Sequence, residues 1–205
     1  EAVTDTNCHL TNFYEVLASQ THFPKFARQV EFTPFSDWAF GNIGRVGTRE
    51  LDAARFFVEY RMSRQGLGKD YATPTTRTRR GMNENVSAWL SAVDGLPECH
   101  ERLRRVEIRT LKAIDFIKQY DDPRALFYLD PPYMHETRSS KGEYGEHEMT
   151  DKQHGELLDC LAKIEGKFML SGYHSDLYDF DALCNDWNCH ERTLPNSASS
   201  SETKE

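Results

Sequence analysis

Four consecutive apolar residues, Leu126-Phe127-Tyr128-Leu129, run directly into the string Asp130-Pro131-Pro132-Tyr133. A short apolar run that stops at prolines is typical of a strand buried on both faces of a parallel sheet. Proline has no backbone N–H and restricts the residue before it, so the strand has to end at this point. We therefore predict a buried parallel strand over 126–129 that carries a carboxylate at its carboxyl end.

The segments around this strand alternate between strand and helix patterns. We predict further strands at 105–108 and 167–170, helices at 113–119, 150–161 and 177–184, and a loop over 195–205. The first residues are typical of the end of a strand, a turn at Asp5-Thr6-Asn7 and a helix. This order predicts an α/β fold with a Rossmann-like sheet, in which ligands bind at the carboxyl ends of the strands.

The middle of the chain, from about residue 23 to 105, differs in character. It combines helical stretches near 53–60, 86–90 and 100–106 with a polar segment over 66–81 that is too hydrophilic to bury much. We expect that segment to be mobile or ordered by a partner. The aromatic residues of this region pack in a small helical domain or stack on bases, and we favour packing. They are Phe32, Phe35, Trp38 and Phe40.

Composition excludes several classes of protein. The hydrophobic fraction of 38% is enough for a core, and no apolar run is long enough to span a membrane. The five cysteines form no CxxC pair and the histidines 147, 154 and 174 have no metal-ligand spacing, so we expect reduced thiols and no metal. The string Ser171-Gly172 lacks the surrounding GxSxG pattern, which argues against acyl transfer.

Charge is unevenly distributed along the chain. The formal net charge is −8, yet residues 49–118 hold 14 Lys and Arg against 10 Asp and Glu. A mildly basic middle is compatible with contact to phosphates and equally with a solvated surface of uneven charge.

The string Asp130–Tyr133 suits a planar substrate that carries an NH₂ group. The Asp130 carboxylate and the carbonyls near Pro131 would form a rigid set of acceptors at the strand end, beside the flat face of Tyr133. Acceptors that hydrogen-bond to an aromatic amine stabilise the positive charge that grows on its nitrogen during nucleophilic attack. A base in a duplex must flip out to reach such a site. The alternative is an ordinary strand-to-turn junction capped by an Asp.

The chain resembles the DNA adenine methylase family, typified by the Dam enzymes. Asp130-Pro131-Pro132-Tyr133 matches the catalytic signature of that family, and four further segments are similar to it: the acidic-x-Asn turn Asp5-Thr6-Asn7, residues 89–105, residues 148–154 and Leu170-Ser171-Gly172-Tyr173. The resemblance implies transfer of a methyl group from S-adenosyl-L-methionine to the exocyclic N6 amine of adenine in double-stranded DNA. Asp130, Pro131, Pro132 and Tyr133 would form the catalytic site.

The resemblance also implies roles outside that string. Residues 1–22 and 106–205 would form the catalytic domain, and residues 23–105 an inserted helical domain that recognises DNA. Asp5 would bind the ribose hydroxyls of the cofactor, with Asp115 as a further cofactor contact because Lys112 stands where an acid is expected. Residues 134–148 would close over the flipped base. Arg77, Arg79 and Arg80 would contact DNA.

The family's glycine-rich cofactor loop is expected before Asp5, and a further strand is expected after residue 205. We therefore expect that both ends of the catalytic fold are missing, and that this chain binds the cofactor poorly and is weakly active or inactive.

Two alternatives stay open from the sequence, namely methylation of the cytosine N4 amine and a non-catalytic DNA-binding remnant of such an enzyme. The sequence does not distinguish a restriction-modification role from phage self-protection or regulation. We expect a cytoplasmic monomer with no membrane partner.

Overall fold

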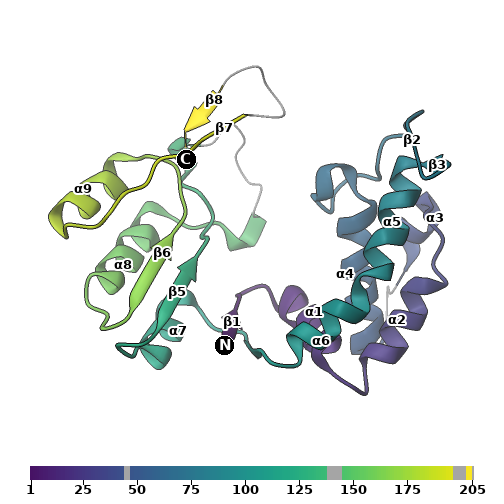
Figure 1. Cartoon of the computed structure of the whole chain (residues 1–205), viewed down its shortest axis with the longest axis horizontal. Helices are drawn as coiled ribbons and strands as arrows, with labels where there is room; N and C mark the ends of the chain where they lie inside the picture. Colours follow the sequence, from purple (N-terminus) through teal and green to yellow (C-terminus); the bar gives the residue numbers. More distant parts are fainter. Residues whose placement is uncertain (44–46, 138–144, 196–201, 205) are drawn as a thin grey trace. The chain divides into compact units, whose positions relative to one another are not determined.

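The computed structural model describes residues 1–43, 47–137, 145–195 and 202–204 (Figure 1). Contacts divide the chain into two compact units, Glu1–Leu111 and Lys112–Glu205. This division does not test the expected domains, 1–22 with 106–205 and 23–105, which remain a prediction.

Unit 1 is mainly helical. Its helices are α1 (Cys8–Ala18), α2 (Phe23–Glu31), α3 (Asp37–Asn42), α4 (Arg49–Met62), α5 (Glu84–Asp94) and α6 (Leu96–Leu103), with a short 3₁₀ helix η1 (Arg64–Gly66). Strand β1 (Ala2–Thr4) pairs in parallel with β4 (Glu107–Arg109), so that Val3 lies opposite Ile108. The strand predicted at 105–108 therefore exists, but it begins two residues later and ends one residue later.

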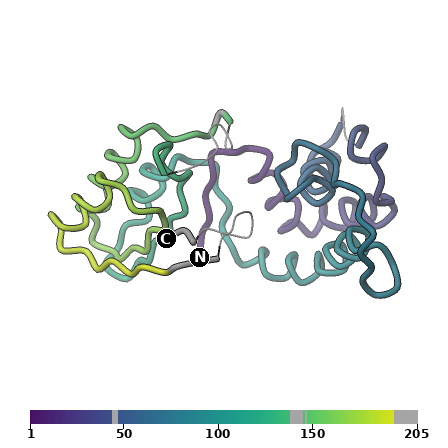
Figure 2. Tube along the Cα trace, turned by 90° about the horizontal axis from the view of Figure 1, so that it is seen from above, coloured from purple at the N-terminus to yellow at the C-terminus, as the bar shows by residue number. Residues whose placement is uncertain are grey.

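The helices of unit 1 gather around one core (Figure 2). Helix α4 lies at its centre and contacts α1, α2, α3 and α5. Phe26, Val30 and Val58 are fully buried. Trp89 is 3% exposed and its indole Nε1 donates a hydrogen bond to the backbone carbonyl of Thr33. Burial of this apolar surface is the main force that holds the unit together.

The aromatic residues near α3 divide into two groups. Phe35 and Phe40 pack against the core and meet the ring of Tyr71, as we expected for this region. Phe32 and Trp38 do not, because each is 72% exposed. The prediction of packing is therefore right for two of these residues and wrong for the other two.

The polar segment 66–81 has more structure than its sequence predicts. Ser63 bridges to Tyr71, and strands β2 (Thr78–Arg79) and β3 (Met82–Asn83) form an antiparallel hairpin. Arg80 and Gly81 form its two-residue turn with positive φ angles of 54° and 74°. Such a turn matches the natural twist of paired strands, and it requires positive φ angles at both central residues. This requirement explains why a glycine stands at its second position.

Unit 2 contains the alternating α/β part. Its elements in order are α7 (Ala113–Tyr120), β5 (Leu126–Leu129), η2 (His135–Thr137), η3 (Gly145–His147), α8 (Asp151–Leu161), β6 (Lys167–Leu170), α9 (Asp176–Cys184), β7 (Thr193–Pro195) and β8 (Glu202–Lys204). β5 and β6 pair in parallel with Leu129 opposite Leu170. Helix α8 begins with the expected capping box, formed by Thr150 and Gln153.

Strand β5 is parallel, as predicted, but it is buried on one face only. Phe127 and Leu129 point into a core with Ile117 of α7 and Leu157 of α8. Leu126 and Tyr128 on the other face are 69% and 68% exposed. The prediction of a buried strand is therefore wrong for Leu126 and Tyr128, since helices of this unit cover one side of the β5–β6 pair.

The end of the chain also differs from expectation. The loop predicted over 195–205 contains the strand pairing of β7 with β8, which is antiparallel with Leu194 opposite Thr203. Residues 196–201 and 205 of that loop lie outside the described residues. Among the helices that the structure describes, none is both long and apolar enough to cross a membrane.

Candidate active site at the carboxyl ends of β5 and β6

The Asp130 side chain is exposed directly after β5, where we predicted a carboxylate at a strand end. Its Oδ1 accepts a hydrogen bond of 2.8 Å from the hydroxyl of Ser171, the first residue after β6. The backbone N–H of Ser171 also donates to the Leu129 carbonyl at 3.0 Å, which continues the ladder between the two strands. The parallel register thus places both side chains at one edge of the sheet.

Tyr133 lies beside a second aromatic residue. Its ring centroid is 4.7 Å from that of Tyr173, and the two planes meet at 66°. Both rings are half-buried, as are Pro131 and Pro132 between Asp130 and Tyr133. The edge-to-face arrangement is the one that aromatic quadrupoles favour. The structure therefore joins the four predicted catalytic residues with Ser171 and Tyr173, which follow the neighbouring strand.

The segment after β6 rests on a buried polar pair. The Tyr178 hydroxyl of α9 lies 2.9 Å from Nδ1 of His154 in α8, and His154 is fully buried. Burial raises the pKa of Tyr178 to about 12, so the phenol is neutral at physiological pH. The contact gives the buried imidazole of His154 a polar partner inside the fold.

Asp5, the expected ribose contact, lies in unit 1 immediately after β1. Its Oδ1 accepts a hydrogen bond of 2.7 Å from the backbone N–H of Asn7, and the carboxyl is half-buried. The Asn7 side chain in turn caps α1 by accepting from the N–H groups of His9 and Leu10. The turn predicted at Asp5-Thr6-Asn7 is therefore present, and it fixes the acid at the end of a parallel strand.

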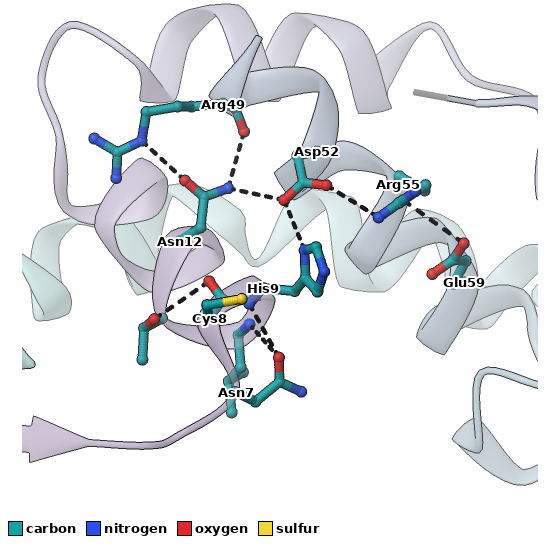
Figure 3. Close-up of polar contacts among 10 residues, drawn as sticks. Asn7, Cys8, His9, Asn12, Arg49, Asp52, Arg55 and Glu59 are labelled. Atoms are coloured by element: carbon teal, nitrogen blue, oxygen red, sulfur yellow. Dashed lines mark hydrogen bonds and ion pairs between the residues drawn. The ribbon is translucent and has the colours of Figure 1, made fainter. Parts of the chain in front are cut away.

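A chain of polar contacts ties this part of α1 to α4 (Figure 3). His9 Nδ1 lies 3.0 Å from Asp52, which also accepts a hydrogen bond from Asn12. Arg55 bonds to the other oxygen of Asp52 at 3.1 Å and lies 3.8 Å from Glu59. Burial raises the pKa of Glu59. These contacts hold the start of α1, and with it the Asp5 turn, against the central helix of unit 1.

Asp115, the other expected cofactor contact, belongs to unit 2. It is exposed in the first turn of α7, next to Lys112 at the N-cap position. An acid in a first turn is favoured by the helix dipole whatever its function. The structure thus gives Asp115 a local explanation and leaves its role as a cofactor contact untested.

The three expected DNA contacts lie together on the β2–β3 hairpin. Arg77, Arg79 and Arg80 are all exposed, and Arg80 donates a hydrogen bond to the Ser91 hydroxyl on α5 at 3.0 Å. The hairpin is fastened at its base by Asn83, whose side chain donates to the Thr75 carbonyl. The result is a small ordered projection that presents guanidinium groups to solvent.

Two expectations from the sequence remain, namely the absence of a metal site and a segment over 134–148 that closes over the base. Among the described residues, no group of three His, Cys, Asp or Glu side chains could hold a metal ion. The segment 134–148, expected to close over the base, begins with buried Met134 and the 3₁₀ helix η2. Residues 138–144 at its centre lie outside the described residues.

Sequence reasoning did not assign a role to Ser171 or Tyr173. On sequence alone, Ser171-Gly172 is rejected as a nucleophile turn and Leu170–Tyr173 is included as a segment similar to the family, without a role for either side chain. The signal that identifies both residues is the matched length of the strands at 126–129 and 167–170. Two parallel strands of equal length, paired end to end, place the next residues of each at the same edge.

Comparison with known proteins gives one family. The model of the D12 class N6 adenine-specific DNA methyltransferases matches residues 80–194, more than half of the 205 residues. The matched part contains Asp130, Tyr133, Ser171, Tyr173 and Asp115, whereas Asp5, Arg77 and Arg79 lie before it. No curated protein matches the chain in a sequence search.

Proposed function

Because the chain belongs to the D12 class N6 adenine-specific DNA methyltransferases, we propose that it methylates adenine in double-stranded DNA with S-adenosyl-L-methionine as donor. The observation that carries this proposal is the exposed Asp130 carboxylate at the end of β5, beside the aromatic pair Tyr133 and Tyr173. The family is defined by the adenine N6 amine, which favours adenine over the cytosine N4 amine that the sequence alone left open.

Asp130 would act on the target amine. The nitrogen lone pair of an aromatic amine is delocalised into the ring, which makes it a poor nucleophile. Acceptance of the amine hydrogens by the Asp130 carboxylate and the Pro131 carbonyl favours a pyramidal nitrogen and stabilises its developing positive charge. Because the acceptors are already in place on a proline-stiffened backbone, little reorganisation accompanies the reaction.

The aromatic pair would hold the base. A flipped adenine stacks on the face of Tyr133, while the edge of that ring is braced by Tyr173 at 4.7 Å. Stacking of this kind compensates part of the cost of removing the base from the duplex.

Asp5 fits a ribose contact, because the bond from the Asn7 N–H fixes a half-buried carboxylate at the end of strand β1. The donor supplies the methyl group, and the protein's part is to bind and align it. Asp115 is the second candidate contact to the donor.

The proposal extends to the architecture. The parallel pairs β1–β4 and β5–β6 are the kind of pairing found in a Rossmann-like sheet. Residues 23–105 would be the inserted domain that recognises DNA, with Arg77, Arg79 and Arg80 of the hairpin on phosphates or base edges.

The test is methyl transfer from labelled S-adenosyl-L-methionine to duplex DNA, followed by digestion and identification of the methylated nucleoside. N6-methyladenine is the expected product. Asp130→Ala should abolish incorporation while DNA binding stays nearly unchanged. Asp159→Asn, at an exposed acid on α8, is the matched control and should retain activity.

Other outcomes decide against the proposal. N4-methylcytosine as the product would replace adenine with cytosine as the target. Binding of both duplex DNA and S-adenosyl-L-methionine by the unaltered protein without any incorporation would favour the non-catalytic remnant.

A further inference from the structure

We infer that Ser171-Gly172-Tyr173, the segment that follows β6, is a positioning element for the two side chains that handle the target base. Ser171 orients Asp130 and Tyr173 braces Tyr133, while Gly172 allows the segment to sit against α9. This inference rests on the proposed function, since it assigns roles within the same site.

The contact of Ser171 with Asp130 fixes one carboxylate oxygen. An exposed aspartate rotates about its terminal torsion, which is broad and lacks sharp staggered minima. The 2.8 Å hydrogen bond from the Ser171 hydroxyl engages Oδ1 and so selects one orientation. The same hydroxyl lies 3.3 Å from the Leu129 carbonyl, which keeps it at the strand edge. Asp130 then presents Oδ2 as its acceptor for the amine.

The contact of Tyr173 with Tyr133 fixes the stacking surface. Tyr133 follows two prolines and lies in a stretch without helix or strand, so its backbone alone does not set the ring's direction. The edge-to-face contact with Tyr173, which follows the neighbouring strand β6, sets the direction of the ring. The two ring centroids lie 4.7 Å apart and the planes meet at 66°. A base that stacks on Tyr133 meets a ring already held in place.

Gly172 explains how the segment keeps its own position. A Cβ atom on Gly172 would lie 2.8 Å from Cε2 of Tyr178, closer than real carbon contacts. The Tyr178 ring therefore packs directly on the backbone of the segment. Its hydroxyl meets buried His154, so the segment is anchored through α9 to α8. Ser171 and Tyr173 flank this closely packed residue.

Steady-state methylation kinetics test the role of Ser171. We expect Ser171→Ala to lower kcat on the order of 10- to 100-fold, because a misaligned acceptor weakens the transition state more than the substrate complex. KM for DNA should change little. Ser171→Thr retains the hydroxyl and should restore most of the rate. If the hydroxyl had only a structural role, Ser171→Ala would alter the melting temperature but would not lower kcat while KM for DNA stays the same.

Ser19→Ala is the matched control, because the Ser19 hydroxyl also forms hydrogen bonds, here as an acceptor from the N–H groups of Thr21 and His22, and it lies in unit 1. It should leave kcat unchanged. A wild-type kcat for Ser171→Ala, or no recovery in Ser171→Thr, would overturn the assignment of Ser171. If Asp130→Ala abolished incorporation while either of these Ser171 results was found, the proposed function would be supported and only this inference would be wrong.

Fluorescence of 2-aminopurine at the target position tests the role of Tyr173. Tyr173→Leu removes the ring and should change the emission of the bound, flipped base and raise KM for DNA, whereas Tyr173→Phe should match the unaltered protein. Equal emission for Tyr173→Leu and the unaltered protein would contradict a bracing role. Gly172→Ala should lower kcat and change the 2-aminopurine emission together, because it displaces the whole segment.

Discussion

The indole nitrogen of Trp89 in α5 donates a hydrogen bond of 3.2 Å to the backbone carbonyl of Thr33, across 56 residues of the chain. The ring also meets that of Phe57 in α4, with centroids 5.3 Å apart. One side chain thus connects the end of α2 to the central helix of unit 1 and satisfies a buried carbonyl.

Replacement of Trp89 should destabilise unit 1 in two steps. Trp89→Phe removes the donor and leaves the Thr33 carbonyl unsatisfied, which costs about 1–3 kcal/mol. Trp89→Ala adds a cavity and should cost about 3–5 kcal/mol. Urea unfolding followed by circular dichroism measures both values. Leu90→Ala, at a neighbour that is 42% exposed, is the control and should cost much less.

The hairpin arginines should contribute to DNA affinity through phosphates. Arg77→Ala and Arg79→Ala should each weaken binding and reduce the slope of log affinity against log salt by about one. Fluorescence anisotropy of a labelled duplex at several salt concentrations measures this slope. Arg124→Ala is the control, since that guanidinium is also exposed but pairs with Asp122 in unit 2. An unchanged slope in both hairpin variants would exclude the hairpin as a phosphate contact.

Glu50 should make the protein sensitive to acid. Its hydrogen bond with His22, and then that with Thr48, lower the pKa of Glu50 from 4.5 to about 2. A carboxyl whose pKa is lower in the folded state adds stability above pH 4.5, and that stability is lost as pH falls towards 2. Glu50→Gln should therefore flatten the fall in melting temperature over this range.

Glu59→Gln is the contrasting variant for that measurement. Burial raises the pKa of Glu59, so its ionisation opposes folding and its replacement should not protect against acid. Equal acid profiles for Glu50→Gln and the unaltered protein would show that Glu50 is not the group responsible.

Local signals in the sequence predicted local structure well. The turn at Asp5 and Asn7 and the capping box of α8 at Thr150 and Gln153 involve residues two or three apart, whose contacts do not depend on the rest of the fold. The apolar run 126–129 likewise predicted β5, because its ends are marked by prolines. The tail was wrongly expected to be a loop throughout, since the short pairing of β7 with β8 leaves little periodic signal.

The sequence by itself determined the Asp130–Tyr133 string, its place after an apolar strand and the type of each neighbouring element, because these depend on residue type and short spacing. Only the tertiary structure decided that Ser171 bonds to Asp130, that Tyr173 meets Tyr133 and that Leu126 and Tyr128 face outward. The register between β5 and β6 and the side on which α7 and α8 pack set these contacts. Both are relations between segments some 40 residues apart, which spacing within either segment does not encode.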